Sequence, residues 1–221
     1  MLGLCGDSLE DCKETVVKTM FLASSFADVA DLFVKFTDGK CEGKTITFIP
    51  TASLPEKVKF YVAAGREALE KMGLLVDELE ISTATKEEIA GKLQCNEYIY
   101  VTGGNTFFLL QELKRTGADK IMAEQINSGK PYVGESAGSV VLSRNIEYVK
   151  DMDDITAAPI LDSFSSLGLV DFYPLPHHTN FPFKEAVENI ISNYAGKIEL
   201  CPISNAQAII VNESEFEVLS K

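Results

Sequence analysis

The feature that most constrains the fold is the run YVGESAGSVVL, which spans residues 132–142. A short apolar strand there leads into Gly-x-Ser-x-Gly, and small apolar residues suited to a helix follow. This order is typical of a nucleophile elbow, a sharp strand-to-helix turn that raises one serine hydroxyl above a sheet. Gly134 and Gly138 fit such a turn because side chains there would collide with the neighbouring strand and helix. The pattern predicts Ser136 as a nucleophile, with backbone N–H groups of the following helix available to an oxyanion.

Segments typical of strands and of helices alternate on both sides of this turn. The sequence predicts strands over 20–25, 45–50, 74–81, 98–101 and 167–173, and helices over 27–36, 58–72, 107–114, 119–126 and 183–194. A capping box, Thr85-x-x-Glu88, opens a further short helix. Such alternation predicts right-handed βαβ units and a mostly parallel sheet between two layers of helices. We expect one three-layer α/β/α domain, with a long loop over 151–166 and short strands in the tail.

Residues 1–19 differ from the rest of the chain, because they are polar, acidic and weakly patterned. We expect them to be an appendage to a catalytic domain that spans residues 20–221. The appendage could be an accessory helix, a disordered arm, or sequence ahead of a natural start at Met20.

Composition excludes several classes of partner. The net charge of -13 disfavours nucleic acid and anionic membrane surfaces, and an acidic substrate would need a local basic pocket. The five cysteines show neither C-x-x-C nor zinc spacing, which indicates reduced thiols in the cytoplasm. No stretch is apolar enough to span a bilayer, and acidic residues stand where a signal peptide needs an apolar core. We expect a cytoplasmic monomer or homodimer that uses no cofactor.

A second strand end carries groups suited to chemistry. Gly103 and Gly104 follow the strand at 98–101 and lead directly into a helix. Open parallel sheets bind ligands beyond the carboxyl ends of their strands, and glycines let backbone N–H groups approach a reacting carbonyl closely. The alternative is a plain strand–helix turn. A phosphate loop is disfavoured because neither G-x-G-x-x-G nor G-x-x-x-x-G-K-[ST] occurs.

A serine nucleophile needs a base, and the chain contains only two histidines, His177 and His178. Adjacent residues of an extended chain point to opposite sides, so one of the two would face Ser136. Exposed loop histidines are the alternative interpretation. We expect no metal, because adjacent histidines chelate poorly and no further His or spaced Cys completes a tetrahedral site.

The third member of a triad orients the imidazole and stabilises its charged form. Three acids, Asp151, Asp153 and Asp154, lie between the serine and the histidines in the sequence. They do not form a calcium loop, since Ile155 and Thr156 stand where a ligand and the turn glycine should be. The alternative is that all three are solvated loop acids.

Three motifs together resemble peptidase E, the aspartyl dipeptidase family. They are Gly-Gly-Asn-Thr-Phe at 103–107, Gly-x-Ser-Ala-Gly at 134–138 and Pro-His-x-Thr-Asn at 176–180. The likeness extends from about Met20 to Ser204-Asn205-x-Gln207-Ala208. It implies a flavodoxin-like fold similar to the class I glutamine amidotransferase domain, and a cytoplasmic serine peptidase.

The resemblance also implies roles for individual residues. It makes Ser136 the nucleophile, His177 the general base, and the N–H groups of Gly104 and Ala137 the oxyanion hole. The family's acid follows the serine by fifteen positions, which corresponds to Asp151, with Asp153 and Asp154 as rivals. Asn105 and Glu135 are the expected substrate-binding residues, with a charge that complements the helix start or a group that supports His177 as the alternatives for Glu135.

The sequence departs from the family at two places. Glu135 precedes the serine where the best-known members have an aromatic residue, and the shorter segment 181–185 replaces an arginine-containing stretch. Lys184 and Arg144 are the remaining candidate cations for an N-terminal aspartate. We expect a serine peptidase that cleaves small peptides through an acyl-enzyme, including N-terminal Asp-X dipeptides as one option. The alternatives are a small esterase or amidase, and a catalytically silent member that binds a peptide or an amino acid.

Overall fold

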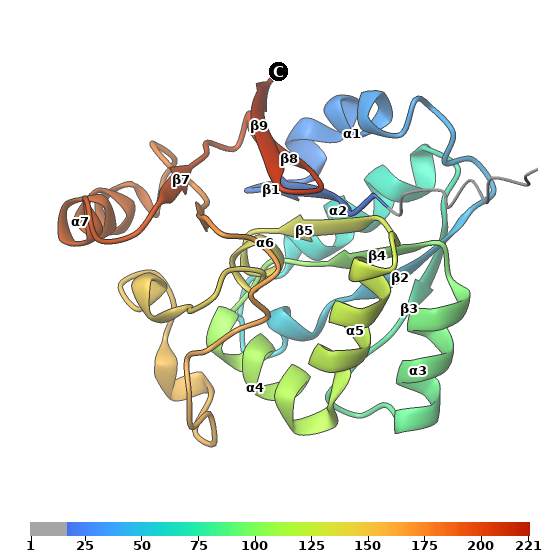
Figure 1. Ribbon diagram of the computed structural model, residues 1–221, viewed down its shortest axis with the longest axis horizontal. Helices are drawn as coiled ribbons and strands as arrows, with labels where there is room; N and C mark the ends of the chain where they lie inside the picture. Colours follow the sequence, from blue (N-terminus) through green and yellow to red (C-terminus); the bar gives the residue numbers. More distant parts are fainter. Residues whose placement is uncertain (1–16) are drawn as a thin grey trace, which may run out of the picture.

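The computed structural model describes residues 17–221, and a central sheet of seven strands runs through it (Figure 1). In spatial order the strands are β3 (Leu75–Glu78), β2 (Thr45–Ile49), β4 (Tyr98–Val101), β5 (Tyr132–Glu135), β1 (Thr19–Ala23), β8 (Gln207–Asn212) and β9 (Glu215–Ser220). The five strands from β3 to β1 pair in parallel, whereas β8 and β9 are antiparallel to their neighbours. The predicted α/β fold with a mostly parallel sheet is confirmed.

Helices cover both faces of this sheet (Figure 1). One face carries the short 3-10 turn η1 (Ala27–Val29) with α1 (Ala30–Phe36) and α2 (Phe60–Lys71), and the other carries α3 (Lys86–Cys95), α4 (Thr106–Thr116) and α5 (Ala118–Asn127). Side chains of β1 alternate between the two resulting cores: Met20 packs in one and Phe21 in the other. This alternation follows from the two-residue period of a strand and makes three layers.

Local sequence signals account for the helix ends. The Thr85 hydroxyl accepts a hydrogen bond from the Glu88 amide at 3.1 Å, as the capping box predicts. The Asn105 side chain caps α4 by accepting from the Phe108 amide at 2.9 Å. Gly117, in the left-handed conformation, ends α4 and separates it from α5.

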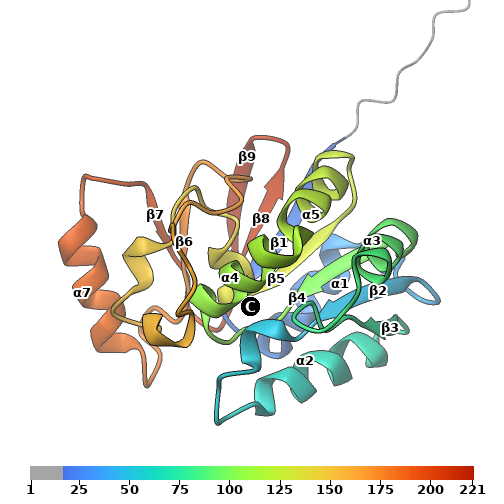
Figure 2. The same cartoon turned by 90° about the horizontal axis from the view of Figure 1, so that it is seen from below.

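The strand expected over 167–173 is wrong, because the segment before Tyr173 is held in a different way. The amides of Leu167 and Leu169 donate to the carbonyls of Val141 and Leu142, just after α6 (Ala137–Val140). The strand begins later, as β6 (Tyr173–Leu175), and pairs in parallel with β7 (Leu200–Pro202) in a second, two-stranded sheet. This sheet and α7 (Lys184–Tyr194) lie to one side of the central sheet in both views (Figures 1 and 2).

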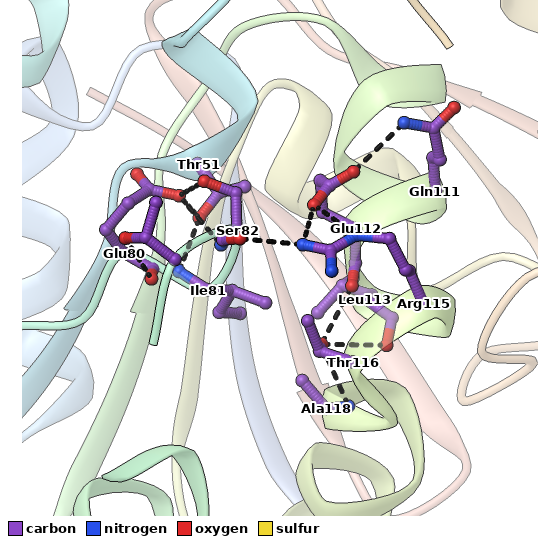
Figure 3. A network of polar contacts seen from close by, with 11 residues as sticks. Thr51, Glu80, Ile81, Ser82, Gln111, Glu112, Leu113, Arg115, Thr116 and Ala118 are labelled. Atoms are coloured by element: carbon purple, nitrogen blue, oxygen red, sulfur yellow. Dashed lines mark hydrogen bonds and ion pairs between the residues drawn. The ribbon is translucent and has the colours of Figure 1, made fainter. Parts of the chain in front are cut away.

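A chain of polar contacts connects the loops beyond β2 and β3 with α4 (Figure 3). The Thr51 hydroxyl, in the 3-10 turn η2 (Thr51–Ser53), donates to Glu80 at 2.8 Å. Arg115 donates to the Ser82 carbonyl at 2.7 Å and forms an ion pair with the buried Glu112. These contacts fix η2, against which the loop after β4 packs.

Two further sequence expectations concern residues 1–19 and the ability of a helix to span a membrane. Most of the expected appendage at 1–19 lies outside the described residues, although Thr19 already belongs to β1. From residue 17 onward, no helix has both the length and the apolar character needed to cross a membrane.

Two helix glycines should respond to alanine with opposite signs. A Cβ on Gly65 of α2 would lie 2.5 Å from the hydroxyl oxygen of Tyr100, a fully buried ring that stacks on Phe48, whereas a Cβ on Gly91 of α3 meets nothing within 4 Å. We expect Gly91→Ala to raise the free energy of unfolding by about 0.5–1 kcal/mol, because alanine loses less backbone entropy in a helix. Gly65→Ala should lower it by about 1–3 kcal/mol through overpacking. Urea unfolding of both variants would test this, and stabilisation by both would contradict the packing described.

Candidate active site

Ser136 occupies a strained turn at the carboxyl end of β5. Its backbone has φ 48° and ψ -107°, a region that residues with side chains rarely adopt. Its amide is held by the Ala23 carbonyl at 2.8 Å. A Cβ on Gly138 would lie 2.2 Å from the carbonyl oxygen of Val101, so only glycine permits this approach. A strand, a strained turn and a short helix thus follow one another in the order that the sequence pattern requires, with Ser136 at the carboxyl end of β5.

His177 faces this serine from the second sheet. Its Nε2 atom lies 2.9 Å from Ser136 Oγ, although the two residues are 41 positions apart. His177 follows β6 with φ 64°, its amide donates to Ser24 Oγ at 3.1 Å, and the Phe183 ring stacks on its imidazole at 4.7 Å. His178 has its backbone tied to the Ile203 carbonyl and makes no side-chain contact with the serine among the described residues. The structure therefore brings His177, and not His178, to Ser136.

The other ring nitrogen of His177 contacts an amide and not a carboxylate. Nδ1 lies 2.9 Å from Asn205 Oδ1. Because that oxygen can only accept, Nδ1 carries the proton and Nε2 is free to accept from the serine hydroxyl. Asn205 follows β7, the strand that pairs with β6, and the Asn180 side chain accepts from its amide at 2.9 Å. The parallel pairing of these two strands places Asn205 beside His177.

The acids expected in this role, Asp151, Asp153 and Asp154, form no hydrogen bond or ion pair with His177 among the described residues. Asp153 accepts from the Thr106 amide at 2.8 Å, at the start of α4, and burial raises the pKa of its carboxyl to about 6. Asp154 accepts from the Thr156 amide and hydroxyl, which lowers its pKa. Asp151 is exposed. These contacts turn the segment toward α4 and away from the imidazole.

Burial lowers the pKa of His177 below its ordinary value of 6.5, and the hydrogen bond to Asn205 opposes this effect. A neutral partner adds no negative charge that would favour the imidazolium. The imidazole is therefore neutral at pH 7, which is the form that can accept a proton.

The two amides expected to bind an oxyanion are both uncommitted. Neither the Gly104 nor the Ala137 N–H donates to another group within residues 17–221. Gly104 has φ 135°, and a Cβ there would lie 2.2 Å from the Ala52 carbonyl oxygen, so the position requires glycine. The Asn105 amide, next in the chain, donates to that same Ala52 carbonyl at 2.8 Å. The Gly104 loop thus rests on η2 with one amide left free.

The two expected substrate-binding residues are engaged elsewhere. Asn105 is buried, caps α4 with its Oδ1 atom, and donates from Nδ2 to the Asp154 carbonyl at 2.9 Å. It does not line the cavity, and its role is to tie the 151–154 segment to α4. Glu135 lines the cavity, but its carboxylate accepts from the Phe26 amide and the Tyr100 hydroxyl, both at 2.9 Å.

A cavity of about 720 Å³ opens above Ser136. Its aromatic and apolar lining residues include Val58, Phe60, Tyr61, Phe181, Pro182 and Phe183. Its acidic lining residues are Asp28, Glu56, Glu135, Asp153 and Asp154, and its lining contains neither lysine nor arginine. No group of three or more His, Cys, Asp or Glu side chains in the described part of the chain could hold a metal ion.

A strained serine paired with a histidine, beside free backbone N–H groups at the carboxyl edge of a parallel sheet, is the arrangement of a serine hydrolase. A family model narrows this class: that of peptidase family S51 matches residues 20–219. The chain belongs to peptidase family S51 and is a serine-type peptidase.

Individual relatives agree with this assignment. An uncharacterized peptidase of Listeria monocytogenes is 55% identical over 199 residues, covering 90% of this chain and 97% of the relative. A peptidase E of Shewanella amazonensis is 35% identical over 136 residues, covering 61% of this chain and 54% of the relative. The crystal structure of a Listeria monocytogenes EGD-e protein, 52% identical, matches with a TM-score of 0.90 over 93% of this chain and 99% of that chain.

Replacing the neutral partner of His177 should change the acidity of its ring. We expect Asn205→Asp to raise the pKa of His177 by about one unit or more, because a carboxylate at 2.9 Å favours the imidazolium. In the wild type the ring should titrate below pH 6.5. NMR titration measures this directly, since the chain has two histidines and His178→Gln assigns the signals. Equal pKa values in wild type and Asn205→Asp would contradict the contact.

Proposed function

We propose that this protein hydrolyses short peptides through an acyl-enzyme formed on Ser136. The observation that carries the proposal is the Ser136 Oγ–His177 Nε2 contact of 2.9 Å in a cavity beside two uncommitted amides. His177 Nε2 takes the hydroxyl proton as Oγ bonds to the scissile carbonyl carbon. The N–H groups of Gly104 and Ala137 stabilise the oxyanion that develops. His177 then returns the proton to the departing amine as the C–N bond breaks, and water releases the acyl group by the same steps.

In this mechanism Asn205 orients the His177 imidazole, as the third residue of a catalytic triad does. It fixes the tautomer in which Nε2 accepts a proton, but it provides no charge to stabilise the imidazolium. Cysteine peptidases of the papain type use asparagine in this way. Burial lowers the pKa of His177 and its partner carries no negative charge, so the unprotonated form of the base is favoured at pH 7.

The charge of the cavity argues against an N-terminal aspartate as the preferred residue. The two candidate cations are engaged elsewhere, because Lys184 pairs with Glu188 and Arg144 with Asp171, and neither lines the cavity. The acidic lining would repel an aspartate side chain and attract an ammonium group. We therefore propose peptides with a free amino terminus and a neutral or basic first residue as substrates, in place of Asp-X dipeptides.

Removal of the nucleophile tests the mechanism. Ser136→Ala should lower kcat on any cleaved peptide by on the order of 10⁴-fold or more, since no other hydroxyl is bonded to the His177 imidazole among the described residues. His178→Gln is the matched control and should retain activity, because that ring does not contact the serine. Loss of a fluorophosphonate label in Ser136→Ala, followed by mass spectrometry, checks the covalent step. Near wild-type turnover in Ser136→Ala would contradict the proposal.

A dipeptide panel tests the substrate class. We expect kcat/KM for Lys-Leu and Ala-Leu to exceed that for Asp-Leu and Glu-Leu by about 10-fold or more at low ionic strength, and added salt should shrink the gap. Hydrolysis of p-nitrophenyl acetate in parallel distinguishes a peptidase from a simple esterase. Cleavage of Asp-Leu alone would retain the mechanism and refute the proposed charge preference.

A further inference from the structure

Glu135 is a buried carboxylate placed immediately before the nucleophile. It is 2% exposed, its carboxylate accepts hydrogen bonds from two segments that are distant in the sequence, and the backbone of a third segment acts on its pKa. Oε1 accepts from the Phe26 amide, in the turn after β1, and Oε2 accepts from the hydroxyl of Tyr100 in β4. The Gly103 amide, in the loop that leads to the oxyanion hole, acts on the same carboxylate as a backbone donor that lowers its pKa. One side chain thus joins the segments that surround Ser136.

Packing alone does not account for this residue. Among the described residues, no lysine, arginine or histidine forms an ion pair with Glu135, so its burial is not offset by an opposite charge. An unpaired buried carboxylate is costly compared with an apolar side chain of similar volume. The fold nevertheless makes room for it, because α2 approaches the Glu135–Tyr100 pair at Gly65, where a side chain would collide with Tyr100.

The contacts of the glycine loop show what the carboxylate does. The Gly103 amide acts on Glu135 as a donor and the Asn105 amide is bonded to the Ala52 carbonyl, so the Gly104 amide between them is the one without an acceptor among the described residues. Gly103 also lies against the nucleophile, since a Cβ on it would be 3.2 Å from Ser136 Cβ. Anchoring the amides on both sides fixes the direction of the free one.

We propose that Glu135 is a positioning residue that, as a carboxylate, holds the Gly103–Gly104 loop against Ser136 and thereby aims the Gly104 amide at the oxyanion. The proposal rests on the proposed serine peptidase function and adds a residue through which the oxyanion hole is built. Glu135 itself does not touch the reacting atoms.

Protonation of Glu135 should weaken its hold on the Gly103–Gly104 loop. A carboxylate can accept all three hydrogen bonds, whereas the protonated group must give up acceptor capacity. Burial raises the pKa of Glu135 to about 7, and the three donors oppose that shift. The titratable groups that face it are Tyr100 from β4, Tyr61 from α2 and Asp28 from η1, none of which is a cation. The loop should therefore be held well above pH 7 and loosened below it.

The experiment compares wild type, Glu135→Gln and Glu112→Gln by the rate of fluorophosphonate labelling of Ser136 between pH 5 and pH 9. We expect Glu135→Gln to label about 10- to 100-fold more slowly at pH 8, because a small displacement of an oxyanion donor has effects of this size. Glu112 is a matched control: it is equally buried in α4 but pairs with Arg115 (Figure 3). Glu112→Gln should lower the melting temperature and keep the two-proton acid slope of the wild type, because Glu112 is bonded to Gln111 and Arg115 and not to the Gly103–Gly104 loop.

The pH profile separates positioning from a loss of stability. In the wild type the labelling rate should fall on the acid side with the uptake of two protons, one by His177 and one by Glu135. In Glu135→Gln one proton should remain, that of His177. An equal rate and an equal acid slope in wild type and Glu135→Gln would overturn the proposal, with the peptidase function still standing. A wild type that does not label at Ser136 would instead refute the proposed function.

A second variant keeps the test decisive if Glu135→Gln does not fold. Tyr100→Phe removes one donor to the carboxylate and leaves Glu135 in place. Because a lost donor raises the pKa of a carboxyl, the midpoint assigned to Glu135 should move to higher pH. An unchanged midpoint in Tyr100→Phe would refute the assignment of that ionisation to Glu135.

Discussion

The close approach of backbone to backbone at the nucleophile turn is the constraint on which the rest of the site depends. A Cβ on Gly134 would lie 2.7 Å from the Gly138 carbonyl oxygen, and one on Gly138 would lie 2.2 Å from that of Val101. Side chains at these two positions would not fit, so the chain can turn sharply at Ser136, whose φ is positive. The Tyr132 hydroxyl, which donates to the Gly138 carbonyl at 2.6 Å, holds the turn on one side. Such strain persists only where the surroundings over-determine it, and here two strands and a helix do so.

The remaining groups reach this turn from two sheets. The central sheet contributes adjacent strand ends: β1 leads to Ser24, β4 to the glycine loop and β5 to the nucleophile. The two-stranded sheet contributes His177 and Asn205, each just beyond the end of one strand. Ser24 connects the two sheets, because its hydroxyl accepts from the His177 amide and donates to the Ile203 carbonyl at 3.0 Å. The site is thus fixed by the pairing of strands together with side-chain hydrogen bonds from Ser24 and Asn205.

Neutral and acidic groups predominate around the nucleophile. The base is oriented by a neutral amide, the residue before the nucleophile is a buried acid, and the cavity lining contains acids without a lysine or arginine. Burial raises the pKa of both Glu135 and Asp153, to about 7 and about 6. The proton occupancy of the cavity therefore changes near neutral pH, where a positively charged substrate group would favour the ionised forms of these acids.

The sequence by itself determined the α/β class and most helices and strands of the central domain, and it predicted the strand–turn–helix order at Ser136 and the glycine loop at 103–104. These depend on patterns of neighbouring residues, such as two-residue alternation, capping boxes and glycines at tight turns. Only the tertiary structure decided the partner of His177, because Asn205 lies 28 residues away and reaches it through the pairing of β6 with β7. The acids of the 151–154 segment lie closer to His177 in the sequence, and a carboxylate stabilises an imidazolium better than an amide does. The amide at the start of α4 binds Asp153 instead, and a local pattern does not record such a long-range competition.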